Sequence, residues 1–185
     1  MPWYNYRNDI KKIIINSGIT SIGDHAFNYC KKATEVSIPD TVTRIGISSF
    51  YQCYSLSSVT IPDSVVAIEK DGFNNCGSLT SITIPDSVET LGDGAFFACT
   101  NLRKVSFGNN TKIIGENAFM DCSNLESVEI PGVLETIHLQ VILRYFIKVM
   151  LMETPSYRYF RYDKIKWRIL DIPIQPFPLK NLIPY

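Results

Sequence analysis

Residues 56–78, LSSVTIPDSVVAIEKDGFNNCGS, align without a gap with residues 79–101, LTSITIPDSVETLGDGAFFACTN, at a spacing of 23 residues. The same spacing extends through most of the chain, and residues that occupy one repeat position in successive copies form a column. Columns that stay in register over five copies identify a repeat protein. The clearest columns contain phenylalanine (Phe27, Phe50, Phe73, Phe96, Phe119), cysteine (Cys30, Cys53, Cys76, Cys99, Cys122) and a strand residue (Val36, Val59, Ile82, Val105, Val128).

Each copy predicts one strand and a return segment, because a period of 23 lies in the range of leucine-rich repeats. The strand reads V-x-I-P, as in residues 59–62, with two apolar side chains on one face and a polar one on the other. Proline has no N–H group and therefore ends the strand. A second apolar pair, such as Val88 and Leu91, returns the chain, and Ala95-Phe96 predicts a short helical or 3₁₀ turn. One copy cannot bury these residues alone, so we expect the copies to stack.

The pattern L-x-x-V/I-x-I-P-D-S-V-x-x-I-G-x-x-A-F-x-x-C closely resembles the BspA-like (Treponema pallidum type) leucine-rich repeat family over residues 10–137. The resemblance implies a bacterial or protozoan cell-surface or secreted protein that acts in adhesion and protein–protein contact. The fold class we expect is an α/β repeat, a leucine-rich-repeat solenoid with 23-residue coils. Its parallel sheet would line the concave face, and short turns or 3₁₀ segments would form the convex face.

The repeat register divides the chain into three parts. Residues 1–12 resemble a partial N-terminal cap, residues 13–137 form the repeat array, and residues 138–185 contain neither Gly nor Cys. The apolar stretch 139–152 predicts a C-terminal capping helix, and an extended tail follows it. Two alternatives stay open for residues 138–185: a disordered segment, or a truncated second domain, whose opening strand residues 157–172 resemble.

Composition and charge exclude two classes of partner. Lys plus Arg and Asp plus Glu number 18 each, so the formal net charge is zero, whereas dedicated nucleic-acid-binding proteins carry a basic excess. The longest apolar stretch, residues 139–152, spans 14 residues and contains Arg144 and Lys148. A membrane helix needs about 20 apolar residues. We therefore expect no nucleic-acid partner and no membrane span, and the start of the chain shows no signal peptide.

The five cysteines all belong to one column, three residues after the phenylalanine. Stacked strands lie about 4.8 Å apart, and disulfides span Cα separations of about 4.4–6.8 Å, so the spacing permits disulfides between coils. We favour the alternative, in which each cysteine is a small, buried, free thiol at a tight turn.

No group of residues predicts catalysis or a metal site. His25 and His138 are the only histidines, and each lies in a turn region, which favours a solvated side chain. The chain has no H-x-x-x-H or C-x-x-C spacing, which excludes zinc sites of the usual type. Residues 92–95, GDGA, resemble the start of a dinucleotide loop, but Phe97 stands where that loop requires a glycine. We expect no enzyme activity, no cofactor and no metal.

The outward-facing strand positions are the candidate ligand-binding surface, because the sheet face of a solenoid commonly binds partners. The alternative is that Ser and Thr are simply suitable residues for a solvent-facing strand. Aromatic residues on the turns are a second candidate, since exposed aromatics anchor partners; they are Tyr29, Tyr51, Tyr54 and Phe97. The candidate face comprises Ser37, Ser58, Thr60, Ser81, Thr83, Arg103, Lys104, Ser106, Glu126 and Glu129.

These observations favour a non-enzymatic module that binds a protein or glycan ligand on a host or neighbouring cell. The alternative is a structural spacer that carries a separate functional domain, and enzymatic chemistry would then require that domain. Exposed strands at an open end of the array also predict end-to-end homodimers.

Overall fold

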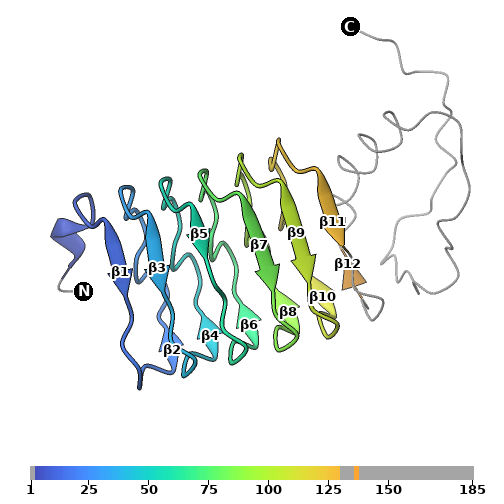
Figure 1. Ribbon diagram of the computed structural model, residues 1–185, viewed down its shortest axis with the longest axis horizontal. Helices are drawn as coiled ribbons and strands as arrows, with labels where there is room; N and C mark the ends of the chain where they lie inside the picture. Colours follow the sequence, from blue (N-terminus) through green and yellow to red (C-terminus); the bar gives the residue numbers. More distant parts are fainter. Residues whose placement is uncertain (1–2, 130–135, 138–185) are drawn as a thin grey trace, which may run out of the picture.

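The computed structural model describes residues 3–129 and Thr136–Ile137. The predicted C-terminal capping helix and extended tail lie outside these residues. Each repeat forms one coil with two strands, and equivalent strands of successive coils lie side by side (Figure 1). The first strands are β1 (Lys12–Ile14), β3 (Glu35–Ser37), β5 (Ser58–Val59), β7 (Ser81–Ile84), β9 (Lys104–Phe107) and β11 (Ser127–Glu129). The second strands are β2 (Ser21–Ile22), β4 (Arg44–Ile45), β6 (Ala67–Ile68), β8 (Thr90–Leu91), β10 (Ile113–Ile114) and β12 (Thr136–Ile137).

All strand pairs are parallel and join residues one repeat apart, as in Ile13 with Val36 and Ile82 with Val105. The second strands form one six-stranded sheet in the order β12-β10-β8-β6-β4-β2. The first strands form two three-stranded sheets, β1-β3-β5 and β11-β9-β7, with an interruption between β5 and β7. The repeat period therefore sets the register of both sides of the solenoid.

The structure confirms the leucine-rich-repeat solenoid and its 23-residue coil, but it corrects two details of the prediction. The second apolar pair does not merely return the chain: Leu91 is buried and belongs to the six-stranded sheet, so each coil contributes a strand to both sides of the solenoid rather than to one. The α/β label also fails for the described residues, whose single helical element is the 3₁₀ helix η1 (Tyr4–Tyr6). The assignment of concave and convex faces stays a prediction.

The expected turn at Ala95-Phe96 forms, with the Phe97 N–H donating to the Gly94 carbonyl at 2.9 Å, but left-handed backbone conformations stop it from continuing into a helix. Gly94 and Ala98 flank this turn with φ of 60° and 53°, and a residue with positive φ stops a right-handed helix. Equivalent residues repeat this geometry in two columns, which are His25, Ser48, Asp71, Gly94, Asn117 and Tyr29, Gln52, Asn75, Ala98, Asp121.

An aromatic column fills the interior from one end of the described coils to the other. Trp3 begins it, and the phenylalanine column continues it with stacked rings whose centroids are 5.0–5.5 Å apart. Offset stacked rings attract one another beyond the burial of their area. The Trp3 indole N–H also donates a hydrogen bond to the Ala26 carbonyl at 2.7 Å, which fastens the first residues to the array.

The cysteine column lies beside the rings, and its five thiols are free and buried, as the sequence analysis favoured. Thiols donate to the carbonyl oxygen of the phenylalanine in the preceding coil, as Cys99 does to Phe73 at 3.3 Å. The same carbonyl accepts the Cys76 N–H at 3.2 Å. Each such carbonyl therefore receives one donor from its own coil and one from the next, so the thiols join neighbouring coils.

Candidate functional site

The candidate face is the outer side of the first strands, where burial alternates along each strand. In β7, Ile82 and Ile84 are buried while Ser81 and Thr83 are exposed. Because the paired strands join residues one repeat apart, as β7 and β9 do, side chains of one column lie next to one another on this face. The predicted residues with described side chains are exposed, apart from Ser106, which is half-buried; for Glu129 the structure gives only its backbone pairing with Ser106.

The central hydroxyls of the candidate face are not used by the protein itself. Within the described residues, the side chains of Ser58, Thr60, Ser81 and Thr83 make no hydrogen bond. Hydroxyls elsewhere in the coils behave differently. The Ser64 hydroxyl, for example, donates to the Val42 carbonyl of the preceding coil at 2.6 Å. The four face hydroxyls therefore remain available as donors and acceptors.

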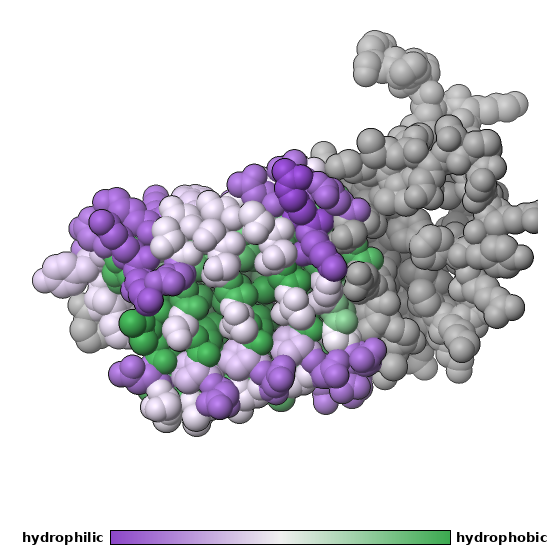
Figure 2. Space-filling model, in the orientation of Figure 1, coloured by the Kyte–Doolittle hydropathy of each residue, from purple (hydrophilic) through white to green (hydrophobic). Residues whose placement is uncertain are grey.

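Ion pairs border this hydroxyl field on both sides. Lys12 pairs with Glu35 at 2.6 Å toward the N-terminal end, and Arg103 pairs with Glu126 at 2.5 Å toward the other end. Figure 2 shows the result: a pale area over β5 and β7 lies between purple, strongly hydrophilic areas over the outer strands. Both pairs are more than half exposed, so each contributes little to stability.

The interruption of the first sheet falls in the middle of the hydroxyl field. β5 and β7 are neighbours in space but do not form a ladder, whereas β7 and β9 pair over four residues. Near the interruption, the Ser78 N–H donates to the Tyr54 carbonyl at 3.0 Å and links the two coils before the strands begin.

Comparison with known proteins agrees with this architecture. A model of the BspA-type leucine-rich-repeat region matches residues 3–126 with six copies, which is more than half of the chain. The chain belongs to the BspA-type leucine-rich-repeat family.

Two solved structures resemble the BspA-type coils of this chain. A leucine-rich-repeat protein of T. pallidum is 32% identical with a TM-score of 0.64, over 66% of this chain and 59% of that one. A leucine-rich-repeat protein from Bacteroides ovatus is 32% identical with a TM-score of 0.57, over 69% of this chain and 39% of that one. This chain therefore spans less than two thirds of the length of either neighbour. No curated protein matches the sequence.

Three of the four aromatic residues of the second candidate site lie together in the BspA-type array, and the fourth does not. Tyr29 and Tyr51 make an edge contact at 5.6 Å, and the ammonium group of Lys31 lies within 6 Å of the rings of Tyr29 and Tyr54. Phe97 lies in a later coil and lines a different depression, described below. The three tyrosines thus form a basic aromatic cluster near the N-terminal end, and Phe97 is separate from it.

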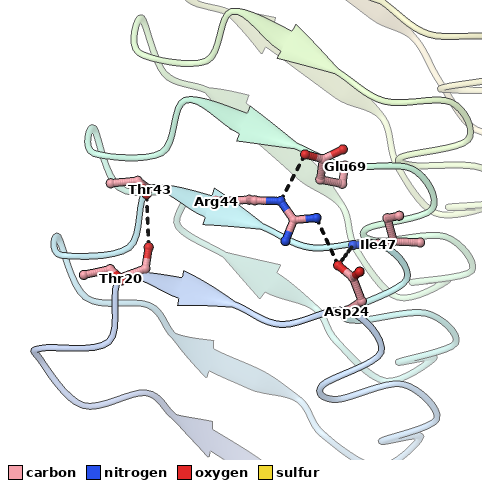
Figure 3. A network of polar contacts seen from close by, with 6 residues as sticks. All are labelled: Thr20, Asp24, Thr43, Arg44, Ile47 and Glu69. Atoms are coloured by element: carbon pink, nitrogen blue, oxygen red, sulfur yellow. Dashed lines mark hydrogen bonds and ion pairs between the residues drawn. The ribbon is translucent and has the colours of Figure 1, made fainter.

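The outer side of the six-stranded sheet carries charges that neutralise one another. Figure 3 shows Arg44 between two carboxylates from neighbouring coils, with Asp24 and Glu69 both at 3.1 Å. Asp24 also accepts the Ile47 N–H at 2.9 Å, and this backbone hydrogen bond, followed by Arg44, lowers the pKa of its carboxyl. The sequence analysis missed Arg44, although the two carboxylates lie 20 and 25 residues from it, close to the coil spacing.

The buried thiols lie in surroundings that disfavour their ionised form. Burial raises the pKa of the Cys30 thiol to about 11 and that of Cys53 to about 12, so these thiols stay protonated at neutral pH. Among residues 3–129 and 136–137, no three His, Cys, Asp or Glu side chains are arranged to hold a metal ion. The same residues contain no helix with the length and apolar character that a membrane crossing requires.

Proposed function

We propose that the array is a non-enzymatic binding module of a bacterial surface or secreted protein, and that the candidate face holds a protein or glycan ligand of a host or neighbouring cell. The observation that supports this proposal most directly is a set of four exposed hydroxyls that make no hydrogen bond within the described residues: Ser58, Thr60, Ser81 and Thr83. BspA-type repeats are typical of protein-interaction surface proteins, which supports an interaction role, and leucine-rich-repeat proteins are generally not enzymes.

The arrangement suits an extended polar ligand. Hydroxyls repeat from coil to coil across the field, so a ligand lying along the solenoid meets donors and acceptors at regular intervals. The Arg103–Glu126 pair at one border presents both signs of charge, and such rim charges set orientation and specificity more than affinity. Adhesion follows in this proposal from many weak contacts of the same kind.

A fourfold variant tests the proposal: Ser58→Ala, Ser81→Ala, Arg103→Ala and Lys104→Ala together. Beads coated with the full chain should adhere to epithelial cell monolayers, and beads coated with the variant should lose most of that adherence. The matched control carries Ser21→Ala, Thr43→Ala, Thr90→Ala and Lys112→Ala on the second strands and their flanks. Adherence that is equal for the variant and the unchanged chain would favour the structural spacer, as would a chain that does not adhere at all.

A further inference from the structure

A depression lies on the turns after β6, β8 and β10, at the column that contains Gly94. This is the first left-handed column, in which Asp71 and Asn117 flank Gly94 in the neighbouring coils. A cavity of about 310 Å³ occupies this position. A Cβ atom on Gly94 would lie 2.5 Å from Asp71 Oδ1, so a side chain here would compete with the Asp71 carboxylate for the same space.

The two aspartates that line this Gly94 pocket are held in place by the protein through one oxygen each. Asn74 donates its amide to Asp71 Oδ1 at 2.6 Å, and Asn75 donates in turn to Asn74. Asp93 Oδ1 accepts the Glu116 N–H at 2.7 Å. Within the described residues, the second oxygen of each aspartate has no protein donor. These fixed carboxylates can therefore accept hydrogen bonds from a ligand, and such charge-assisted bonds are strong.

Phe97 adds an apolar wall to the pocket. Its side chain is half-buried, and it belongs to the column that contains Tyr51 and Asn74 in earlier coils. An aromatic face beside hydrogen-bond acceptors suits a ring that carries C–H groups on one side and hydroxyls on its edge. A pyranose sugar has this combination.

The charge and the volume of the pocket limit the class of ligand that it can bind. Three carboxylates, Asp71, Asp93 and Glu116, outnumber the single cation Lys70 in the lining, so an anionic ligand would be repelled. A metal ion does not fit, because the described residues include no suitable group of three ligating side chains. The volume lies at the small end of the roughly 300–1,000 Å³ typical of ligand pockets, which suits one sugar unit.

We propose that the Gly94 pocket binds an uncharged hexose unit, with its hydroxyls on the Asp71 and Asp93 carboxylates and its apolar face against Phe97. The site is separate from the candidate face and does not depend on the proposed function. Binding of a single exposed sugar unit should be weak, with a Kd on the order of a millimolar.

Saturation-transfer NMR on the full chain tests the proposal with methyl glucoside, methyl galactoside, methyl mannoside and glucuronic acid as probes. At least one neutral glycoside should receive saturation from the protein, and glucuronic acid should not. Two variants should weaken the binding about tenfold or more. Gly94→Asn places a side chain in the pocket, and asparagine tolerates the left-handed conformation, as Asn117 does one coil later. Phe97→Ala removes the apolar wall.

Tyr51→Ala is the matched control, since Tyr51 occupies the same repeat position as Phe97 but lies outside the pocket. Circular dichroism of each variant confirms that the array is folded. The proposal is overturned if no neutral glycoside binds, if glucuronic acid binds as well as the neutral probes, or if folded Gly94→Asn binds like the unchanged chain. Bead adherence of Gly94→Asn should stay unchanged, which separates this site from the candidate face.

Discussion

The two sides of the solenoid differ in continuity. The six-stranded sheet runs without interruption from β2 to β12, whereas the opposite side is broken between β5 and β7. The interior columns continue across that interruption: the rings of Phe50 and Phe73, which precede β5 and β7, stack with centroids 5.0 Å apart. The Cys76 thiol also donates to the Phe50 carbonyl there, at 3.3 Å. Cohesion between coils thus resides in the interior columns and the continuous sheet.

Interior and outer positions differ in how much the residue type changes from coil to coil. The interior positions repeat Phe and Cys in five successive copies because each must fit its neighbours above and below. The outer column at Lys12, Glu35, Ser58, Ser81 and Lys104 changes charge and size along the array, since its side chains face solvent. Binding chemistry can therefore be placed on the first strands, or in a turn, without disturbing the stack.

Replacing Phe73 with Ala should have the largest effect, because it removes a fully buried ring from the column at the broken sheet. We expect a loss of about 3–5 kcal/mol of unfolding free energy. Urea denaturation followed by circular dichroism measures it. The transition should also broaden or split, since repeat arrays are stabilised by interfaces between neighbours.

Phe27→Ala is the comparison for that experiment, because Phe27 is only half-buried near the N-terminal end of the column. It should cost clearly less than Phe73→Ala and leave a single transition. Equal losses for the two variants would show that the stack does not reinforce the coils at the interruption.

Gly92→Ala tests the continuous sheet at the residue that follows β8. A Cβ atom at this position would lie 2.6 Å from the carbonyl carbon of Glu69, in the backbone of the preceding coil. The coils would have to separate locally, and we expect a loss of about 1–3 kcal/mol in urea denaturation. Gly77→Ala is the control, since its nearest contact would be Thr100 Oγ1 at an ordinary 3.5 Å. If Gly92→Ala proved as stable as Gly77→Ala, the close approach of these coils would not limit their packing.

The sequence predicted the repeat, the coil length and the buried columns because stacking forces identical interior residues in each copy. It did not predict the second sheet, since pairs such as Thr90-Leu91 are too short to show alternation. It predicted the turn at Ala95-Phe96, but not that the turn stops before it becomes a helix, because Ala98 gives no sign of a left-handed conformation. The free, buried thiols followed from their place beside each Phe, whereas their hydrogen bonds to the preceding coil did not.

Of the two candidate sites, the sequence predicted the candidate face but not the Gly94 pocket. Exposure of the face residues follows from strand alternation, so the sequence located Ser58 and Ser81 correctly on the outside. The sequence analysis did not predict the Gly94 pocket, because a glycine in a turn ordinarily indicates only a requirement of the backbone conformation. An alignment of this column could have revealed the pocket, because Gly94 lacks a side chain while Asp71 and Asn117 in the neighbouring coils have one.

The smallest effect concerns the thiols that join the coils, and it depends on pH. Burial raises the pKa of Cys53 from 9.0 to about 12, so the native state keeps its proton when the unfolded chain loses it. The stabilisation is therefore complete below about pH 9 and is lost as the pH rises toward the folded value. Between about pH 8 and pH 10, Cys53 should contribute about 1 kcal/mol to the fall in unfolding free energy. In Cys53→Ser that fall should be smaller by this amount, because a serine hydroxyl does not ionise.

Ser49→Ala is the control: it is also at a buried position, and it should change the stability but not its pH dependence. Urea denaturation in the presence of a reductant measures all three proteins, and identical pH dependence in Cys53→Ser and the unchanged chain would show that the column does not shield its thiols.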